Sequence, residues 1–201
     1  QKGRITFGLK GGRCNSDAID NSAGVNCSDV EVNIKIALAS AMRSGRLSRE
    51  DRDRLLFEMT DAVADIVLEN NYLQTLSISV SSEEGLAGLP LLTRMMDVLE
   101  ADGHLDRVVE TLPDEEALRV RRQAEKGLTR AEIGVLLSYG KIVLFDQLLD
   151  SALPDDPYME PLLHSYFPDR MRAAFAGDIA GHRLRREIIA TRLANDVVNR
   201  G

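Results

Sequence analysis

The stretch Asp17-Ala-Ile-Asp-Asn-Ser-Ala-Gly-Val-Asn-Cys-Ser-Asp-Val-Glu31 joins a polar turn of small residues to the start of a helix. Ser28 followed three residues later by Glu31 is a capping box, which predicts that the helix begins at Ser28. Its free N–H groups and positive dipole end would point back at residues 21–25, as in sites that bind anions or nucleotides. A loop that simply meets a helix gives the same pattern, and spacing alone favours this simpler alternative.

Downstream of Ser28 the chain has the pattern of one helix after another, with apolar residues at helical spacing. Thr129 and Glu132 form a second capping box. A loop containing Gly85, Gly88 and Pro90 is expected before residue 91. The expected helices cover residues 28–44, 48–80, 91–101, 113–125, 130–138, 140–151, 158–166, 169–176 and 178–200. This organisation predicts a mainly α fold, an irregular multi-helix array.

Two short segments near the N-terminus favour strands instead. Residues 5–9 alternate apolar and polar side chains, and Ala18-Ile19 could belong to a second strand. Both are too short to form a sheet alone, so they would be the last edge of a larger sheet.

Composition excludes several classes of partner. The 201 residues carry a net charge of −7, which argues against binding to nucleic acid or to an anionic membrane. No apolar run approaches the roughly 20 residues that cross a bilayer, and no secretory signal is present. Cys14 and Cys27 lack the spacing of a metal site, so we expect free thiols and a cytoplasmic protein.

The opening stretch resembles the NAD-specific glutamate dehydrogenases, in particular the very large bacterial subunits. The matching motifs are Asp-Asn-Ser-Ala-Gly-Val at 20–25, Cys-Ser-Asp at 27–29 and Val-Asn-Ile-Lys at 32–35. The resemblance continues through residues 128–132, 153–158 and 182–191, and so covers nearly the whole chain. Because Gln1 is not an initiator and the last helical pattern is interrupted, we expect a piece cut at both ends from a larger polypeptide.

The resemblance implies roles for four residues. Asn21 would lie against the nicotinamide end of NAD, and Ser28 would contact the side-chain carboxylate of glutamate. Gly24 and Val25 would line the same crevice. The smaller hexameric enzymes of the family have alanine and glycine where this chain has Ser22 and Ala23, which makes the carry-over to Ser28 less direct.

The resemblance also implies an activity and a division of the chain. The family oxidises L-glutamate to 2-oxoglutarate and ammonia by hydride transfer to NAD, and we expect a homo-oligomer. Residues 1–44 would be the C-terminal edge of the NAD-binding catalytic domain, which would explain a remnant strand, and residues 45–201 a C-terminal helical domain. The family's catalytic lysines and aspartate lie before this region, and Gly8–Gly12 is not a G-x-G-x-x-G fingerprint. No catalytic residue is therefore assigned, and the isolated chain should be inactive.

Other reactive residues have simpler explanations. The three histidines His104, His164 and His182 are far apart, so we predict no metal site. Arg186 falls near the apolar row of its helix and should reach a neighbouring carboxylate. Residues 128–146 have the spacing of a helix-turn-helix DNA reader, but Lys141 is the only basic residue of the second helix. The stronger alternative is that residues 45–201 form a helical oligomerisation or interaction domain with no ligand site of its own.

Overall fold

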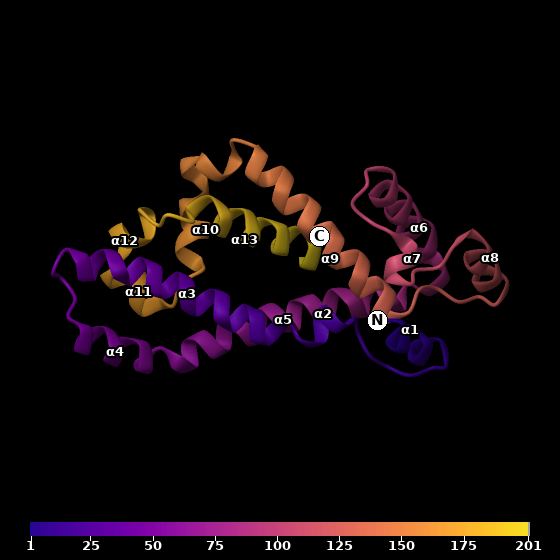
Figure 1. Cartoon of the computed structure of the whole chain (residues 1–201), viewed down its shortest axis with the longest axis horizontal. Helices are drawn as coiled ribbons and strands as arrows, with labels where there is room; N and C mark the ends of the chain where they lie inside the picture. Colours follow the sequence, from indigo (N-terminus) through magenta and orange to yellow (C-terminus); the bar gives the residue numbers. More distant parts are fainter. Residues whose placement is uncertain (201) are drawn as a thin grey trace. The chain divides into compact units, whose positions relative to one another are not determined.

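The computed structural model describes residues 1–200, and it contains helices but no strand in that range (Figure 1). The prediction of a mainly α multi-helix array is therefore confirmed. The helices are α1 Lys2–Leu9, α2 Asp17–Asp20, α3 Ser22–Arg43, α4 Arg49–Glu58, α5 Thr60–Glu83, α6 Gly85–Ala101, α7 Arg107–Glu110, α8 Glu115–Gln123, α9 Arg130–Asp150, α10 Glu160–Ser165, α11 Asp169–Ala174, α12 Ala176–Ala180 and α13 Arg185–Arg200, with 3₁₀ turns at Leu153–Asp155 and Pro157–Met159.

The predicted remnant strand is wrong. Residues 5–9 lie in α1, and Ala18-Ile19 lie in α2. Ser16 caps α2 by accepting a hydrogen bond from the Ile19 N–H at 3.4 Å. A strand needs a neighbouring strand for its backbone hydrogen bonds, whereas a short capped helix satisfies its own, so the helical form prevails here.

The predicted start of the first long helix is also wrong. α3 begins at Ser22, so Ser28 lies inside the helix and the Glu31 carboxylate pairs with Lys35 instead of capping. Between Ser22 and Ser28 the residue least favourable to a helix is Gly24, and its cost is about 1 kcal/mol. Propagating an existing helix through one glycine is easier than nucleating a new one, which explains the earlier start.

Further boundaries differ from the predictions. The segment predicted as one helix over 178–200 divides into α12, which ends at Ala180, and α13, which begins at Arg185, because the His182 side chain accepts from the Leu184 N–H in the turn between them. The segment 48–80 divides into α4 and α5 at Met59, and α6 already begins at Gly85 and includes Pro90. The segments predicted as 130–138 and 140–151 form one continuous helix, α9. Gly140 does not interrupt it, since one glycine costs a helix only about 1 kcal/mol. The missing side chain also allows Met95 to pack closely, because a Cβ at Gly140 would lie 2.7 Å from Met95 Cε. The turn required by a helix-turn-helix reader is therefore absent from α9.

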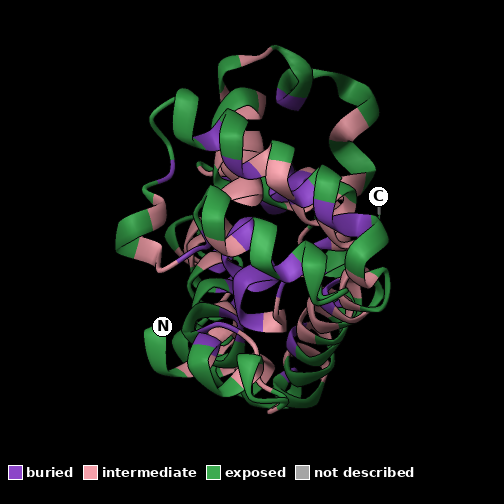
Figure 2. Cartoon of the chain, turned by 90° about the vertical axis from the view of Figure 1, so that its right-hand side faces the viewer, coloured by how far each residue is buried: buried purple, intermediate pink, exposed green. Residues whose placement is uncertain are grey.

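The chain divides into two compact units. The first unit comprises Gln1–Ser22, Tyr72–Val143 and the residues from Val198, and the second comprises Ala23–Asn71 and Leu144–Val197. Each has its own core, and Figure 2 shows buried residues in purple on helix faces whose opposite faces are exposed. The largest fully buried side chains of the first unit are Ile78, Leu89, Met96, Leu118, Ile133 and Leu136.

The second unit is built around α3. Helical spacing predicts an apolar stripe on this helix, and the stripe is confirmed because all five of its residues are buried: Val30, Ile34, Ala37, Leu38 and Ala41. All of them except Ala41 belong to one apolar cluster with side chains of α10, α11, α12 and α13, among them Leu163, Met171, Ile179 and Ile189. Ser48 caps α4 by accepting from the Asp51 N–H at 3.0 Å, as its position before an acidic first turn predicts.

The first unit contains a buried ion pair at the start of α9. Arg121 Nη1 and Nη2 donate to the two carboxylate oxygens of Glu132 at 2.7 and 2.6 Å. The same carboxylate accepts from the Thr129 N–H at 2.7 Å, and the Glu132 N–H donates to Thr129 Oγ1 at 3.3 Å. The second predicted capping box therefore forms, and it joins α8 to α9.

Within residues 1–200, no helix is long and apolar enough to cross a membrane.

Candidate functional site

The four predicted site residues occupy consecutive turns of one stretch of chain. Asn21 separates α2 from α3, and Gly24, Val25 and Ser28 belong to the first two turns of α3. All four are exposed, with Val25 at 60%. Both the amide of Asn21 and the hydroxyl of Ser28 are therefore accessible to a ligand from solvent.

Gly24 gives this stretch an open face. A Cβ added at Gly24 would meet no atom within 4 Å, so the backbone can be approached closely there. The carboxamide of Asn21 offers two N–H donors and an acceptor oxygen. These groups can bind and orient a planar polar ligand, but none of them is a general acid or base at neutral pH.

A chain of hydrogen bonds in the first unit passes through Ser22, the residue after Asn21, and ends at Ile19. Lys141 Nζ donates to Gln74 Oε1 at 2.7 Å, and Gln74 Nε2 donates to Ser22 Oγ at 3.2 Å. Ser22 Oγ in turn donates to the carbonyl oxygen of Ile19 at 2.8 Å. The end of α2 is thus linked through α5 to α9.

Lys141 is the most perturbed titratable group near this network. Burial lowers its pKa from 10.5 to about 8, and the hydrogen-bond acceptor of its ammonium group is neutral. Sequence reasoning considered Lys141 only as a poor DNA contact. The available signal was a single lysine followed by the apolar run Ile142-Val143-Leu144-Phe145, which predicts an ammonium group held close to a core.

The remaining candidates have structural partners. His182 is 5% exposed, with Nε2 3.1 Å from the Asn33 carbonyl oxygen and Nδ1 accepting from the Leu184 N–H at 3.0 Å. Arg186 pairs with Asp155, so its predicted contact with a carboxylate is confirmed. Across residues 1–200, no three His, Cys, Asp or Glu side chains are grouped as metal ligands would be.

Two family models match the chain. The model described as the catalytic domain of bacterial NAD-glutamate dehydrogenase matches residues 1–81. The model described as glutamate dehydrogenase, C-terminal, matches residues 125–201. The matched segments lie on either side of residues 82–124 and together include all four predicted site residues.

Three relatives match almost the whole chain, and each is described as an NAD-specific glutamate dehydrogenase. The relative from Pseudomonas aeruginosa is 46% identical over 199 residues, and that from Halomonas elongata is 42% identical over 199 residues, in both cases 99% of this chain. The relative from Mycobacterium tuberculosis is 41% identical over 197 residues, 98% of this chain. The chain spans only 12% of the length of each of these relatives.

Proposed function

Because the chain belongs to the family of large bacterial NAD-specific glutamate dehydrogenases, we propose that it works as a C-terminal part of an enzyme that converts L-glutamate, NAD and water into 2-oxoglutarate, ammonia and NADH. The observation that carries this proposal is identity of 41–46% over nearly all of the chain to relatives that bear that name. Residues 1–44 would complete the NAD-binding catalytic domain, and residues 45–201 would form a helical domain of structural or regulatory use.

The proposed ligand contacts are Asn21, Gly24 and Val25 for NAD and Ser28 for glutamate. Support comes from the exposure of all four residues and from the open space at Gly24, which leaves room for the nicotinamide ring. When bound, NAD supplies the hydride acceptor. The part of this chain is to orient: the Asn21 amide holds the nicotinamide end, and the Ser28 hydroxyl donates to the glutamate carboxylate.

No proton-transfer residue is assigned within the chain, so the isolated 201 residues should not oxidise glutamate. Lys141, despite its lowered pKa, is hydrogen-bonded to Gln74 and has no assigned contact with a ligand. We propose that the hydrogen bonds from Lys141 through Gln74 to Ser22 fix the backbone next to Asn21.

Steady-state kinetics of the full-length enzyme test these roles. Asn21→Ala should raise KM for NAD and Ser28→Ala should raise KM for glutamate, each about tenfold, since each removes one hydrogen bond to a bound ligand. Gln123→Ala and Thr191→Ala are matched controls, because both residues are exposed and far in sequence from residues 21–28. Unchanged KM values in both site variants would remove the proposed ligand contacts.

A second candidate function is that the helical region acts in assembly, with no ligand site of its own. The observation that favours it is the exposure of large apolar side chains, such as Phe57 at 82% and Tyr158 at 83% in the second unit. Contacts between subunits of a homo-oligomer would cover them. Phe57→Ser in the full-length enzyme should then lower the molar mass of the oligomer, measured by light scattering, without a change in KM for NAD or glutamate. An unchanged molar mass for both Phe57→Ser and Tyr158→Ser would exclude these residues from the interface.

A further inference from the structure

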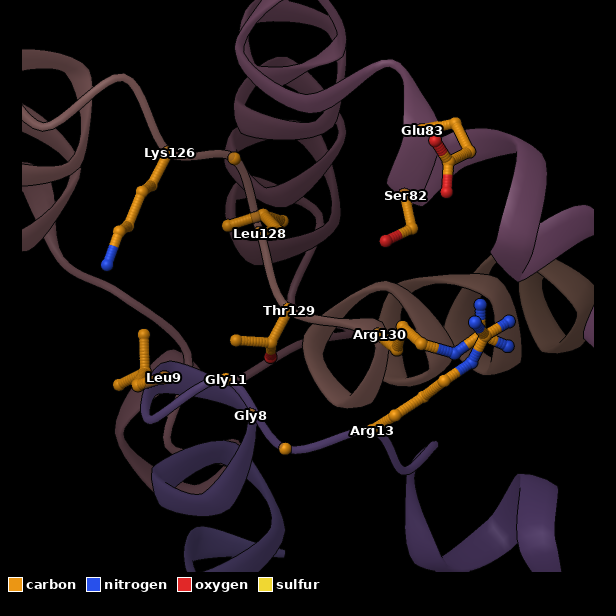
Figure 3. Close-up of a pocket in the computed structure, with 12 residues that line it drawn as sticks. Gly8, Leu9, Gly11, Arg13, Ser82, Glu83, Lys126, Leu128, Thr129 and Arg130 are labelled. Atoms are coloured by element: carbon orange, nitrogen blue, oxygen red, sulfur yellow. The ribbon is translucent and has the colours of Figure 1, made fainter.

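The first unit contains a hollow of about 410 Å³ beside the start of α9. Its walls are the glycine-rich segment 8–13, the end of α5 at Ser82 and Glu83, and residues 126–130 (Figure 3). Gly8 allows the first wall to approach α9, because a Cβ there would lie 3.1 Å from Thr129 Cβ. A hollow of this volume is large enough for a small metabolite.

Two guanidinium groups converge at one end of this hollow. Figure 3 shows the side chains of Arg13 and Arg130 extending toward each other. Their proximity has an electrostatic effect: the pKa of Arg130 is lowered, mainly by burial and next by the charge of Arg13. Two like charges held this close leave a region of positive potential that an anion would relieve.

The Arg130 guanidinium is held in place by neutral groups. It donates to Asn15 Oδ1 at 3.1 Å, to Ser79 Oγ at 2.9 Å and to the carbonyl oxygen of Thr75 at 3.4 Å. None of these acceptors is charged; the charges of Asp20 and Glu83 nearby raise the pKa of Arg130, but burial and the charge of Arg13 lower it more. Five N–H donors are available on an arginine, so donors remain for a ligand.

The charge around the hollow is opposite to that of the chain. Lys126 joins Arg13 and Arg130 as a third cation, and Glu83 is the single carboxylate among the lining residues. The lining therefore carries three positive charges and one negative charge, within a chain whose net charge is −7. Local concentration of positive charge in an acidic protein points to an anionic ligand.

From these observations we propose that the hollow binds a phosphoryl group, bridged by the guanidinium groups of Arg13 and Arg130, while Lys126 lies on the other side of the hollow (Figure 3). Two forked guanidinium groups match the several acceptor oxygens and the double charge of a phosphate better than the two oxygens and single charge of a carboxylate. The source of the phosphoryl group is either a nucleotide or a free phosphate. This proposal does not depend on the proposed function, because it rests on different residues.

Titration of the ¹⁵N-labelled 201-residue chain with inorganic phosphate tests the proposal. Amide shifts should cluster at residues 8–13 and 126–130. Arg13→Gln should weaken phosphate binding about tenfold, as expected for loss of a charge-assisted contact, and its urea midpoint should stay unchanged because the side chain is exposed. Arg94→Gln is the matched control, since Arg94 is an exposed arginine of the same unit outside the hollow.

Two further titrations identify the source and the selectivity. Binding of adenosine monophosphate more tightly than phosphate would support a nucleotide source, and equal binding would support free phosphate. Acetate binding as tightly as phosphate would overturn the phosphoryl assignment. Phosphate shifts spread evenly over surface arginines, or equal weakening in Arg13→Gln and Arg94→Gln, would overturn the site itself.

Discussion

Replacing Glu132 by glutamine should destabilise the first unit by about 3–5 kcal/mol, the usual cost of breaking a buried ion pair from one side. Glu132 is 0% exposed and Arg121 is 9% exposed, so the guanidinium would lose its carboxylate partner away from water. A glutamine oxygen in the place of Oε2 can still accept from Thr129 and from Arg121 Nη1, but the NH₂ group in the place of Oε1 would face the N–H donor of Arg121 Nη2. Such a loss is a large part of the roughly 5–15 kcal/mol that stabilises a typical domain.

Urea unfolding of the 201-residue chain, followed by circular dichroism, measures this cost. With a slope of about 1–3 kcal/mol per molar urea, the midpoint of the transition that reports the first unit should fall by at least about 1 M. Glu116→Gln is the control, because Glu116 pairs with Arg119 on the exposed surface of α8, the helix that also carries Arg121. Its midpoint should stay close to that of the parent chain.

A double substitution separates the buried charge from the capping role. Arg121→Met combined with Glu132→Gln removes the unpaired guanidinium and keeps an acceptor for Thr129, so it should recover part of the stability lost in Glu132→Gln. If Glu132→Gln and Glu116→Gln unfold at the same urea concentration, the buried pair contributes nothing and the reasoning is refuted.

The other predictions concern four single sites. Gly134→Ala should lower the free energy of unfolding by about 1–3 kcal/mol, and with it the urea midpoint, because a Cβ there would lie 2.9 Å from Ser16 Oγ. Gly24→Ala should raise the free energy of unfolding by up to about 1 kcal/mol, because a Cβ at Gly24 meets no atom within 4 Å. Ser48→Ala should cost about 1 kcal/mol in the same assay, through loss of the cap of α4. Burial lowers the pKa of His182 below 6.5, so the unfolded chain binds a proton at this residue more readily than the folded chain. The free energy of unfolding should therefore be highest above about pH 6.5 and decrease below it. Urea midpoints measured across this pH range should decrease less in His182→Gln. Equal slopes in the two proteins would contradict that assignment.

Periodicity predicted helix content and the buried side of α3 because both depend on residues within one helix. Val30, Ile34 and Leu38 are all buried, as their spacing requires. The Thr129–Glu132 capping box also formed, since Leu128 before it and Ile133 after it are both buried and fix the direction of the chain. Local signals held where tertiary packing agreed with them.

Boundaries failed where a local signal had a tertiary alternative. Pro90 suggested a loop, yet Leu89 and Leu92 on either side of it are buried in α6, and their packing outweighs the hydrogen bond that proline cannot donate. Gly140 suggested a turn, yet Met95 occupies the space beside it. Neither neighbour can be identified from a single sequence, because both contacts join residues that the sequence does not mark as partners.

The early start of α3 changes the argument for Ser28 but leaves its proposed role open. If Ser28 had been the N-cap, its oxygen would accept from a backbone N–H of the first turn, which fixes the side chain while its O–H can still donate. In the second turn of α3 the hydroxyl is exposed and its own backbone N–H is within the helix, so the side chain can donate to a carboxylate. The proposed contact of Ser28 is then this hydroxyl, whereas the free N–H groups of the helix N-terminus belong to residues 22–25 in the first turn of α3. Consequently Ser28→Thr, which keeps a hydroxyl, should retain most of the affinity for glutamate that Ser28→Ala loses, and equal losses in the two variants would show that the hydroxyl is not the contact.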